Sequence, residues 1–316
     1  MSYGFIGVPI FFVISGFVIS LSIGKKKISS GYFGNFVLRR SIRLDLTYWV
    51  AIGLAIFLLW VKLNVLNQDA EIPSLQTVFI HMFYLQDLLE QKPIISVVYW
   101  TLCMEVQLYI TYILIVWGSQ KLTLALKATD QNVLLILIVG LGLISLCYDQ
   151  KLLVSINSGL FLPYWHYFLM GILLANTVQR QPTSQRVLFS WLIIECFFLV
   201  IGEPKPYALA GILTTSAIWF VWHRKQLDSL FTSQVFLFLG KISYSLYLIH
   251  PDVGWKFISV CKVLLGDHIN GYISFLVFSL SILLSIGVAF ILYLLLEAPS
   301  LKLCNRLKVN RAVHNS

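Results

Sequence analysis

The residue of this chain that is best suited to take part in a chemical reaction is a carboxylic acid within an apolar helix. Glu105 lies near the start of a span predicted over residues 99–118, and it shares a helical face with Thr101 and Tyr109. A charge in the bilayer costs roughly 2.5–3.5 kcal/mol, so such a residue faces a polar interior. A carboxylate there is a candidate general base or orienting group. The alternative is an ion pair with a neighbouring basic residue.

Two arginines form a second candidate site at the opposite end of another span. Arg40 and Arg43 stand three residues apart and share a helical face. Guanidinium groups bind phosphate oxygens with two parallel hydrogen bonds, so a phosphate-rich donor such as coenzyme A would suit them. The charge run alone favours a different role, in which the arginines anchor the span to lipid phosphates.

A third polar stripe runs along the span predicted over 232–250. Ser243, Tyr247 and His250 follow one another at helical spacings, and Pro251 is expected to end the helix at the outer boundary. A histidine at a wet edge can move protons. The commoner role is that of a hydrogen-bonded boundary residue.

One further acid, Glu195, lies in the middle of the span predicted over 188–202. It could pair with His166 or with Lys241, and the sequence alone leaves both partners open. A structural role is favoured for Glu195 and His166.

These residues are positioned by a chain that is 58% apolar and only 12% charged. A soluble domain carries about 25% charged residues, and a helix needs about 20 apolar residues to cross a bilayer. We therefore predict an all-α, polytopic transmembrane helical bundle, as a single domain over 1–316, with nine spans: 5–23, 46–64, 99–118, 132–149, 159–177, 188–202, 207–222, 232–250 and 271–296. A short, polar piece over 75–89, which contains His81, Gln86 and Asp87, is predicted to be re-entrant or interfacial.

The basic residues set the orientation of these spans. The predicted topology places sixteen of the 23 Lys and Arg residues on one side, many in a predicted basic loop over 24–45, and six on the other. Basic residues are retained on the cytoplasmic side, which puts the N-terminus outside and a tail over 297–316 inside. The net charge of +9 then needs no nucleic-acid partner. The five cysteines form no CxxC pair and suggest neither a metal site nor a disulfide framework.

Five segments, taken in order, resemble one family. They read GVPIFFVISGF over 7–17, RRSIR over 39–43 followed by Tyr48-Trp49, WTLCMEVQLY over 100–109, LGKISYSLYLIHP over 239–251 and LEAP over 296–299. Together they resemble the acyltransferase-3 family of integral-membrane O-acyltransferases, which includes O-antigen, exopolysaccharide and peptidoglycan O-acetylases.

The resemblance implies a multi-pass protein of the bacterial inner membrane. It implies an acyl-CoA, usually acetyl-CoA, as co-substrate from the cytoplasm, with no bound cofactor, and a hydroxyl of a lipid-linked or surface glycan as acceptor. It also assigns roles within the segments above. Glu105, Arg40 and Arg43 are the expected catalytic residues, and the expected substrate-binding or supporting residues are Trp100, Gln107, Tyr109, Tyr247 and His250.

The chain also departs from the family pattern. It is expected to lack the first span and the essential histidine that ends it, because residues 1–7 already correspond to the start of the second span. Pro9 and Leu46 stand where the family often has Asp and Pro. An inactive or helper remnant is therefore the alternative to an active acyltransferase. A glycan transporter is a third hypothesis, disfavoured because no inverted repeat or matching pair of broken spans is visible.

Overall fold

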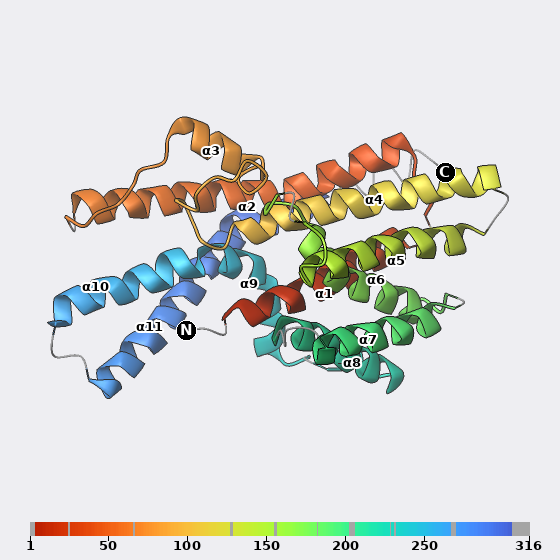
Figure 1. The fold of residues 1–316 in the computed structure, drawn as a ribbon. Helices are drawn as coiled ribbons and strands as arrows, with labels where there is room; N and C mark the ends of the chain where they lie inside the picture. Colours follow the sequence, from red (N-terminus) through yellow and green to blue (C-terminus); the bar gives the residue numbers. More distant parts are fainter. Residues whose placement is uncertain are drawn as a thin grey trace. The chain divides into compact units, whose positions relative to one another are not determined.

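The computed structural model describes residues 4–24, 26–65, 67–126, 129–154, 157–181, 183–201, 206–227, 229–230, 232–266 and 270–304, and these form helices joined by turns and irregular segments. Within these ranges no strand occurs (Figure 1). The predicted all-α class is thus confirmed. Of the tail predicted over 297–316, residues 305–316 lie outside the described part.

Five helical segments are long and apolar enough to cross a membrane: Ser30–Asn64, Trp100–Ala125, Gln131–Asp149, Ser184–Ile201 and Gly271–Cys304. They correspond to α2 (Ser30–Asn64), α4 (Trp100–Leu126), α5 (Asp130–Asp149), α7 (Ser184–Ile201) and α11 (Gly271–Leu292) with its continuation. Four further helices occupy other predicted spans: α1 (Gly7–Ile23), α6 (Trp165–Val178), α8 (Pro206–His223) and α9 (Gln234–His250). The chain is therefore a polytopic membrane protein, and the number nine stays a prediction.

The predicted basic loop over 24–45 is wrong, because α2 begins at Ser30 and runs unbroken for 35 residues. At about 1.5 Å per residue this helix is about 52 Å long, well beyond the hydrocarbon thickness of roughly 30 Å. The segment contains no proline to interrupt it. Its charged residues mark a polar extension of the span rather than a loop, so Arg40 and Arg43 stand on a rigid helix.

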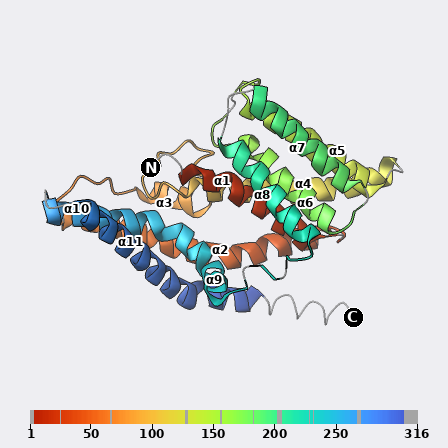
Figure 2. The ribbon, with the colours of Figure 1, turned by 90° about the horizontal axis from the view of Figure 1, so that it is seen from below.

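Pro251 ends α9 as predicted, but it does not end the helical course of the chain. A π-helical turn, η3 (Pro251–Trp255), follows directly and leads into α10 (Lys256–Leu265), as Figure 2 shows for these consecutive elements. Proline lacks the N–H that an α-helix would use at this point, which is consistent with a local change of hydrogen-bonding pattern.

The piece predicted to be re-entrant or interfacial begins with a short helix, α3 (Leu75–Met82), followed by turns. Ser74 caps this helix, since its hydroxyl accepts a hydrogen bond from the Thr77 amide at 3.2 Å. His81 is buried, and its Nδ1 lies 2.9 Å from the Thr77 carbonyl oxygen. Burial lowers the pKa of His81, so the neutral ring is favoured.

The chain forms two compact units: residues 1–30 with 101–230, and residues 31–100 with 231–316. The first unit is built around α6, whose residues from Trp165 to Thr177 are all buried. Helices α1, α5, α7 and α8 all pack against α6. A helix that is apolar on every side needs such complete cover.

The crossing of α1 and α6 is unusually close because glycines face each other there. A Cβ atom on Gly171 would meet the backbone of Val13 and Phe17, and one on Gly16 would meet the backbone of Phe168. Small residues allow membrane helices to approach at backbone distance, where dispersion contacts are densest.

In the second unit, α9 packs against α11, and η3 contacts α9, α10 and α11. The Tyr244 hydroxyl of α9 donates to the Leu44 carbonyl of α2 at 3.0 Å, and the Cys304 thiol donates to the Arg39 carbonyl at 3.2 Å. Tyr48 of α2 stacks on Tyr84 with ring centroids 4.7 Å apart. Side-chain contacts thus fix several elements to the long helix α2.

We predict that Gly171→Ala destabilises the first unit by about 1–3 kcal/mol, because the added methyl group must separate α1 from α6. Thermal unfolding of the detergent-purified chain, followed by size-exclusion chromatography, measures the effect. Gly140→Ala on α5 is the matched control, since nothing lies within 4 Å of a Cβ there. Equal melting temperatures for Gly171→Ala and Gly140→Ala would contradict the close crossing.

Candidate active site

Glu105 is the centre of a small hydroxyl-rich cluster in the first unit. Its side chain is buried, with 8% of the residue exposed. The Tyr109 hydroxyl, one turn along α4, donates to Glu105 Oε1, and the Ser15 hydroxyl of α1 donates to the same oxygen at 3.4 Å. The predicted shared face of Glu105 and Tyr109 is confirmed, and the segment over 7–17 supplies a third member that the sequence did not reveal.

The two hydroxyl donors fix the orientation of the carboxyl group within an otherwise apolar helix pair. Tyr109 is itself held by packing, because it is buried and its ring lies 6.1 Å from that of Phe168. A carboxylate that is oriented in this way can accept a proton or position a reacting hydroxyl group. The cluster therefore has the composition that general-base chemistry requires.

Both ends of the Gln107 amide bind the backbone of the segment before α6. Its Nε2 donates to the Gly159 carbonyl at 2.9 Å, and its Oε1 accepts from the Phe161 amide at 3.2 Å. Gln107 therefore fixes the segment that leads into the 3-10 turn Leu162–Tyr164 and α6. This fits the supporting part of its predicted role.

The polar stripe of α4 continues beyond Tyr109. The Tyr112 hydroxyl donates to Ser20 Oγ at 3.1 Å, and the Ser20 hydroxyl donates to Asn176 Oδ1 at 3.3 Å. Further along, Gln120 accepts from the Ile28 amide at 2.8 Å and donates to the Lys26 carbonyl at 2.9 Å. The helical spacing of Tyr112 and Gln120 along α4 was a signal in the sequence, but their partners in α1 and in the segment that follows it could not be read from it.

Glu195 pairs with His166, one of the two partners that the sequence left open. His166 Nδ1 lies 2.9 Å from Glu195 Oε1, and the Trp191 indole donates to the same oxygen at 3.1 Å. His166 is fully buried, and Glu195 is 1% exposed. The pair joins α6 to α7 and is consistent with the favoured structural role.

In the second unit, the arginine pair lies on one face of α2 as predicted. Arg40 is half-buried and stands 5.9 Å from the Phe36 ring centroid, whereas Arg43 is exposed. The charge of Arg43 acts on Glu297, which is buried and accepts a hydrogen bond from the Ser245 hydroxyl at 2.8 Å. Three of the five sequence segments therefore converge here, those over 39–43, 239–251 and 296–299.

A further acid that the sequence analysis did not single out follows Arg43 by two residues in α2. Asp45 accepts hydrogen bonds from the Ser41 hydroxyl and from the Tyr84 hydroxyl, the latter at 2.9 Å. Its neighbours in the sequence are a mixture of charged and apolar residues, so nothing distinguished it from a solvated carboxylate.

The remaining predicted residues have contacts of a positioning kind. The Tyr247 hydroxyl donates to the Val98 carbonyl at 3.0 Å, just before α4 begins at the half-buried Trp100. His250 is half-buried, and its Nδ1 lies 2.9 Å from the Tyr247 carbonyl oxygen. Trp100, Tyr247 and His250 belong to the unit that contains Arg43, whereas Glu105 belongs to the other. No cluster of three or more His, Cys, Asp or Glu side chains suited to a metal occurs among the described residues.

Comparison with known proteins defines the class. The sequence profile of the acyltransferase domain of the acyltransferase-3 type matches residues 2–294, and the chain belongs to this family. The match runs through both units and through four of the five sequence segments, all but the final LEAP.

Among curated proteins, the chain is similar to proteins named "Putative O-acetyltransferase" from Staphylococcus aureus strains COL, MSSA476 and N315. Each is 26% identical over 330 aligned residues, which cover 94% of this chain and 52% of the relative. The chain thus spans about half the length of the relatives that it matches. No solved structure matches it.

We predict that Gln107→Leu accelerates hydrogen exchange at the Phe161 amide roughly fivefold, because the lost hydrogen bond stabilises the closed state by about 1 kcal/mol. The reciprocal variant Gln120→Leu should accelerate exchange at Ile28 instead. Exchange mass spectrometry in detergent measures both segments in one experiment. Faster exchange at both segments in either variant would indicate general loosening of α4 rather than two local anchors.

Proposed function

We propose that this chain transfers an acyl group, expected to be acetyl, from a cytoplasmic acyl-CoA to a hydroxyl of a lipid-linked or cell-surface carbohydrate. The carrying observation is the Glu105 cluster: a buried carboxyl group held by two hydroxyls within a family acyltransferase segment. The location would be the bacterial inner membrane, with the N-terminus outside and the C-terminus in the cytoplasm. The excess of basic residues on one side of the predicted topology supports this orientation.

The reaction exchanges a thioester for an ester. The acyl carbon loses its bond to the coenzyme A sulfur and gains a bond to the acceptor oxygen, and the hydroxyl proton ends on the thiolate. Glu105 would accept or orient that proton as the oxygen attacks, with Tyr109 and Ser15 holding the carboxyl group in place. A base in this position contributes most when the acceptor hydroxyl is otherwise too weak a nucleophile.

Arg40 and Arg43 would bind the phosphates of the donor. Their position on the extended helix α2 gives them a fixed spacing, and the exposure of Arg43 leaves its guanidinium accessible to a ligand. Bidentate binding of phosphate by arginine is stronger than binding by a flexible point charge. Binding of lipid phosphates at the same place would give an anchor instead, and dependence on donor concentration separates these roles.

The names of the staphylococcal relatives support acetyl as the transferred group. Because this chain corresponds to about half of each relative, donor and acceptor are proposals for this chain and are best tested on it directly.

We predict that Glu105→Gln lowers the rate of acetyl transfer at least about 100-fold, since a general base contributes roughly that factor or more. Inverted membrane vesicles that contain the chain would receive radiolabelled acetyl-CoA, and label in the glycan and lipid fractions would be counted. Glu195→Gln is the matched control, because Glu195 is also a buried glutamate of the first unit but contacts His166. Transfer by Glu105→Gln at the control's rate would remove Glu105 from the site. A wild-type chain that transfers no label would overturn the proposed function itself.

We predict that Arg43→Ala raises the KM for acetyl-CoA about tenfold or more through loss of a charge-assisted hydrogen bond. Arg186→Ala, which removes another exposed arginine from the predicted inner side, should leave this KM unchanged. Initial rates over a series of acetyl-CoA concentrations distinguish the two. An unchanged KM in Arg43→Ala, with normal insertion into the membrane, would favour the lipid-anchor role.

A further inference from the structure

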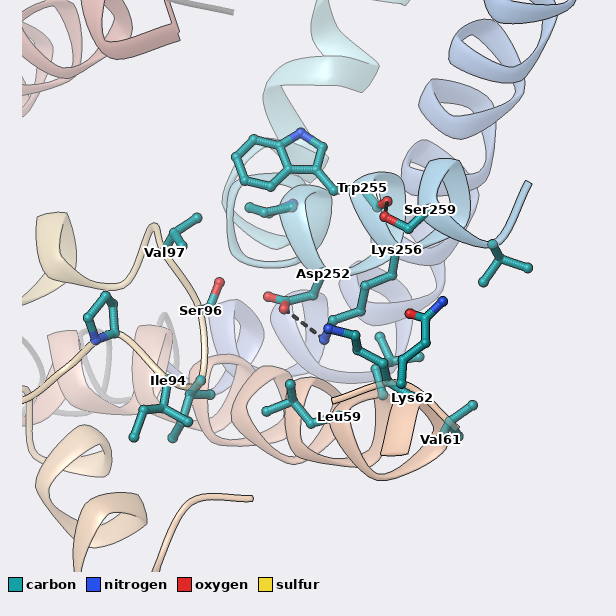
Figure 3. Close-up of a pocket in the computed structure, with 16 residues that line it drawn as sticks. Leu59, Val61, Lys62, Ile94, Ser96, Val97, Asp252, Trp255, Lys256 and Ser259 are labelled. Carbon is teal, nitrogen blue, oxygen red and sulfur yellow. Dashed lines mark hydrogen bonds and ion pairs between the residues drawn. The ribbon is translucent and has the colours of Figure 1, made fainter. Parts of the chain in front are cut away.

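A cavity of about 340 Å³ lies entirely within the second unit (Figure 3). Its walls come from the end of α2, from the extended segment over 93–97, and from η3 with the start of α10. This volume is at the lower end of the range for small-molecule sites. None of the residues that the sequence analysis singled out as site candidates lines it.

Two buried polar side chains of the cavity have unused hydrogen-bonding capacity. Asp252 is 6% exposed; its Oδ1 pairs with Lys256 Nζ at 3.1 Å, while its Oδ2 has no hydrogen-bond partner. Ser96 is also 6% exposed, and its Oγ has no partner. Figure 3 shows Ser96 on the extended segment, opposite Asp252 on the helical wall.

A third unpartnered group lies close behind them. The Tyr99 hydroxyl is buried without a hydrogen-bond partner, and Tyr99 is an electrostatic neighbour of Asp252. At neutral pH a tyrosine hydroxyl keeps its proton, so the Tyr99 hydroxyl remains a donor. Buried polar groups are nearly always paired, and each one left unpaired costs about 1–3 kcal/mol. Two such groups, Asp252 Oδ2 and Ser96 Oγ, belong to residues that line the cavity, and together they indicate a place that a polar ligand completes.

The composition of the walls limits the chemistry of that ligand. Lys256 already neutralises Asp252, so the carboxylate is a poor receptor for a further cation but a good acceptor for a hydroxyl group. Ser96 can donate or accept. Apolar side chains complete the lining, among them Leu59, Ile94 and the half-exposed indole of Trp255. Hydroxyl partners beside apolar and aromatic surface suit the two faces of a pyranose ring.

The position of the cavity in the chain agrees with an acceptor site. Its lining includes parts of both long segments that the distribution of basic residues places outside, those over 65–98 and 251–270. A lipid-linked or surface glycan would arrive from that side.

We propose that this cavity is a subsite for a neutral sugar residue of the acceptor, whose hydroxyls are bound by Asp252 and Ser96. The assignment to an acceptor rests on the proposed function, whereas the binding of a sugar does not. In this arrangement a sugar hydroxyl donates to Asp252 Oδ2, and a second hydroxyl exchanges a hydrogen bond with Ser96. Asp252 and Ser96 are binding residues with no chemical step assigned to them.

The test uses saturation-transfer NMR on the full chain in nanodiscs, with methyl α-D-glucopyranoside as the probe. We expect millimolar binding to the wild type, about fivefold weaker binding to Ser96→Ala, and at least about tenfold weaker binding to Asp252→Asn. Asparagine keeps the shape of the side chain and one oxygen that can still accept from Lys256. Its NH2 group replaces the second carboxylate oxygen, so the acceptor proposed for the sugar hydroxyl becomes a donor.

Ser259→Ala is the matched control for Ser96→Ala. Ser259 also lines the cavity, but its hydroxyl already donates to the Trp255 carbonyl at 2.9 Å, so its removal should leave sugar binding unchanged. Melting temperatures show that the variants are folded. Because Ser96→Ala only removes one oxygen, it keeps the test decisive even if Asp252→Asn disturbs the ion pair.

Three outcomes would overturn the subsite. They are no saturation transfer to the probe at millimolar concentrations, equal binding by Ser96→Ala and wild type, and displacement of the probe by inorganic phosphate, which would indicate an anion site at Lys62 and Lys256. The acetyl-transfer assay is read separately. Sugar binding without transfer would leave the subsite standing while the proposed function fails, and transfer without sugar binding would do the reverse.

Discussion

A carboxyl group buried in an apolar helical protein must find hydrogen-bond donors or a cation, and this requirement organises both units of the chain. Glu105 is held by Ser15 and Tyr109, and Glu195 by His166 and Trp191. In the second unit Glu297 is held by Ser245. In each case at least one donor comes from a different helix, so satisfying the acid also fixes how two helices pack.

Close backbone contact supplies the second organising element in the first unit. The glycines at the crossing of α1 and α6 bring the two helices to backbone distance, and α6 then presents Phe168 to Tyr109 of α4 and Asn176 to Ser20 of α1. A wider crossing would lengthen the bond from Ser20 to Asn176. The packing of α1 on α6 and the hydrogen bonding of the buried polar groups thus depend on the same few positions.

The sequence was sufficient to predict most helices, because long apolar runs leave few alternatives in a membrane protein. It also placed Glu105 and Tyr109 on one face, since that relation depends only on helical periodicity. It failed over 24–45, where charged residues suggested a loop and the structure has the first half of α2. Charged residues indicate contact with water or lipid headgroups. A helix that extends beyond the bilayer makes such contact as well as a loop does.

The contacts between distant segments could not be predicted by the same reasoning. Gln107 binds the backbone of residues about 50 positions away, and the cavity brings Ser96 near Asp252 across more than 150 positions. Neither residue type nor spacing predicts such a contact, because tertiary packing alone determines it. Asp252 in particular lies between the predicted spans over 232–250 and 271–296. A carboxylate in such a segment is expected to contact water, so it did not stand out as a candidate.

The unbroken course of α2 has a mechanical consequence. Arg40 and Arg43 lie in its first half, whereas Leu59 and Lys62 near its end line the cavity. About twenty residues of continuous helix separate them, or roughly 30 Å of a stiff rod. A pivot of this rod about its middle would displace both ends at once and in opposite directions. A single rigid element therefore connects the arginine pair to the cavity, with no need for a relay of side chains between them.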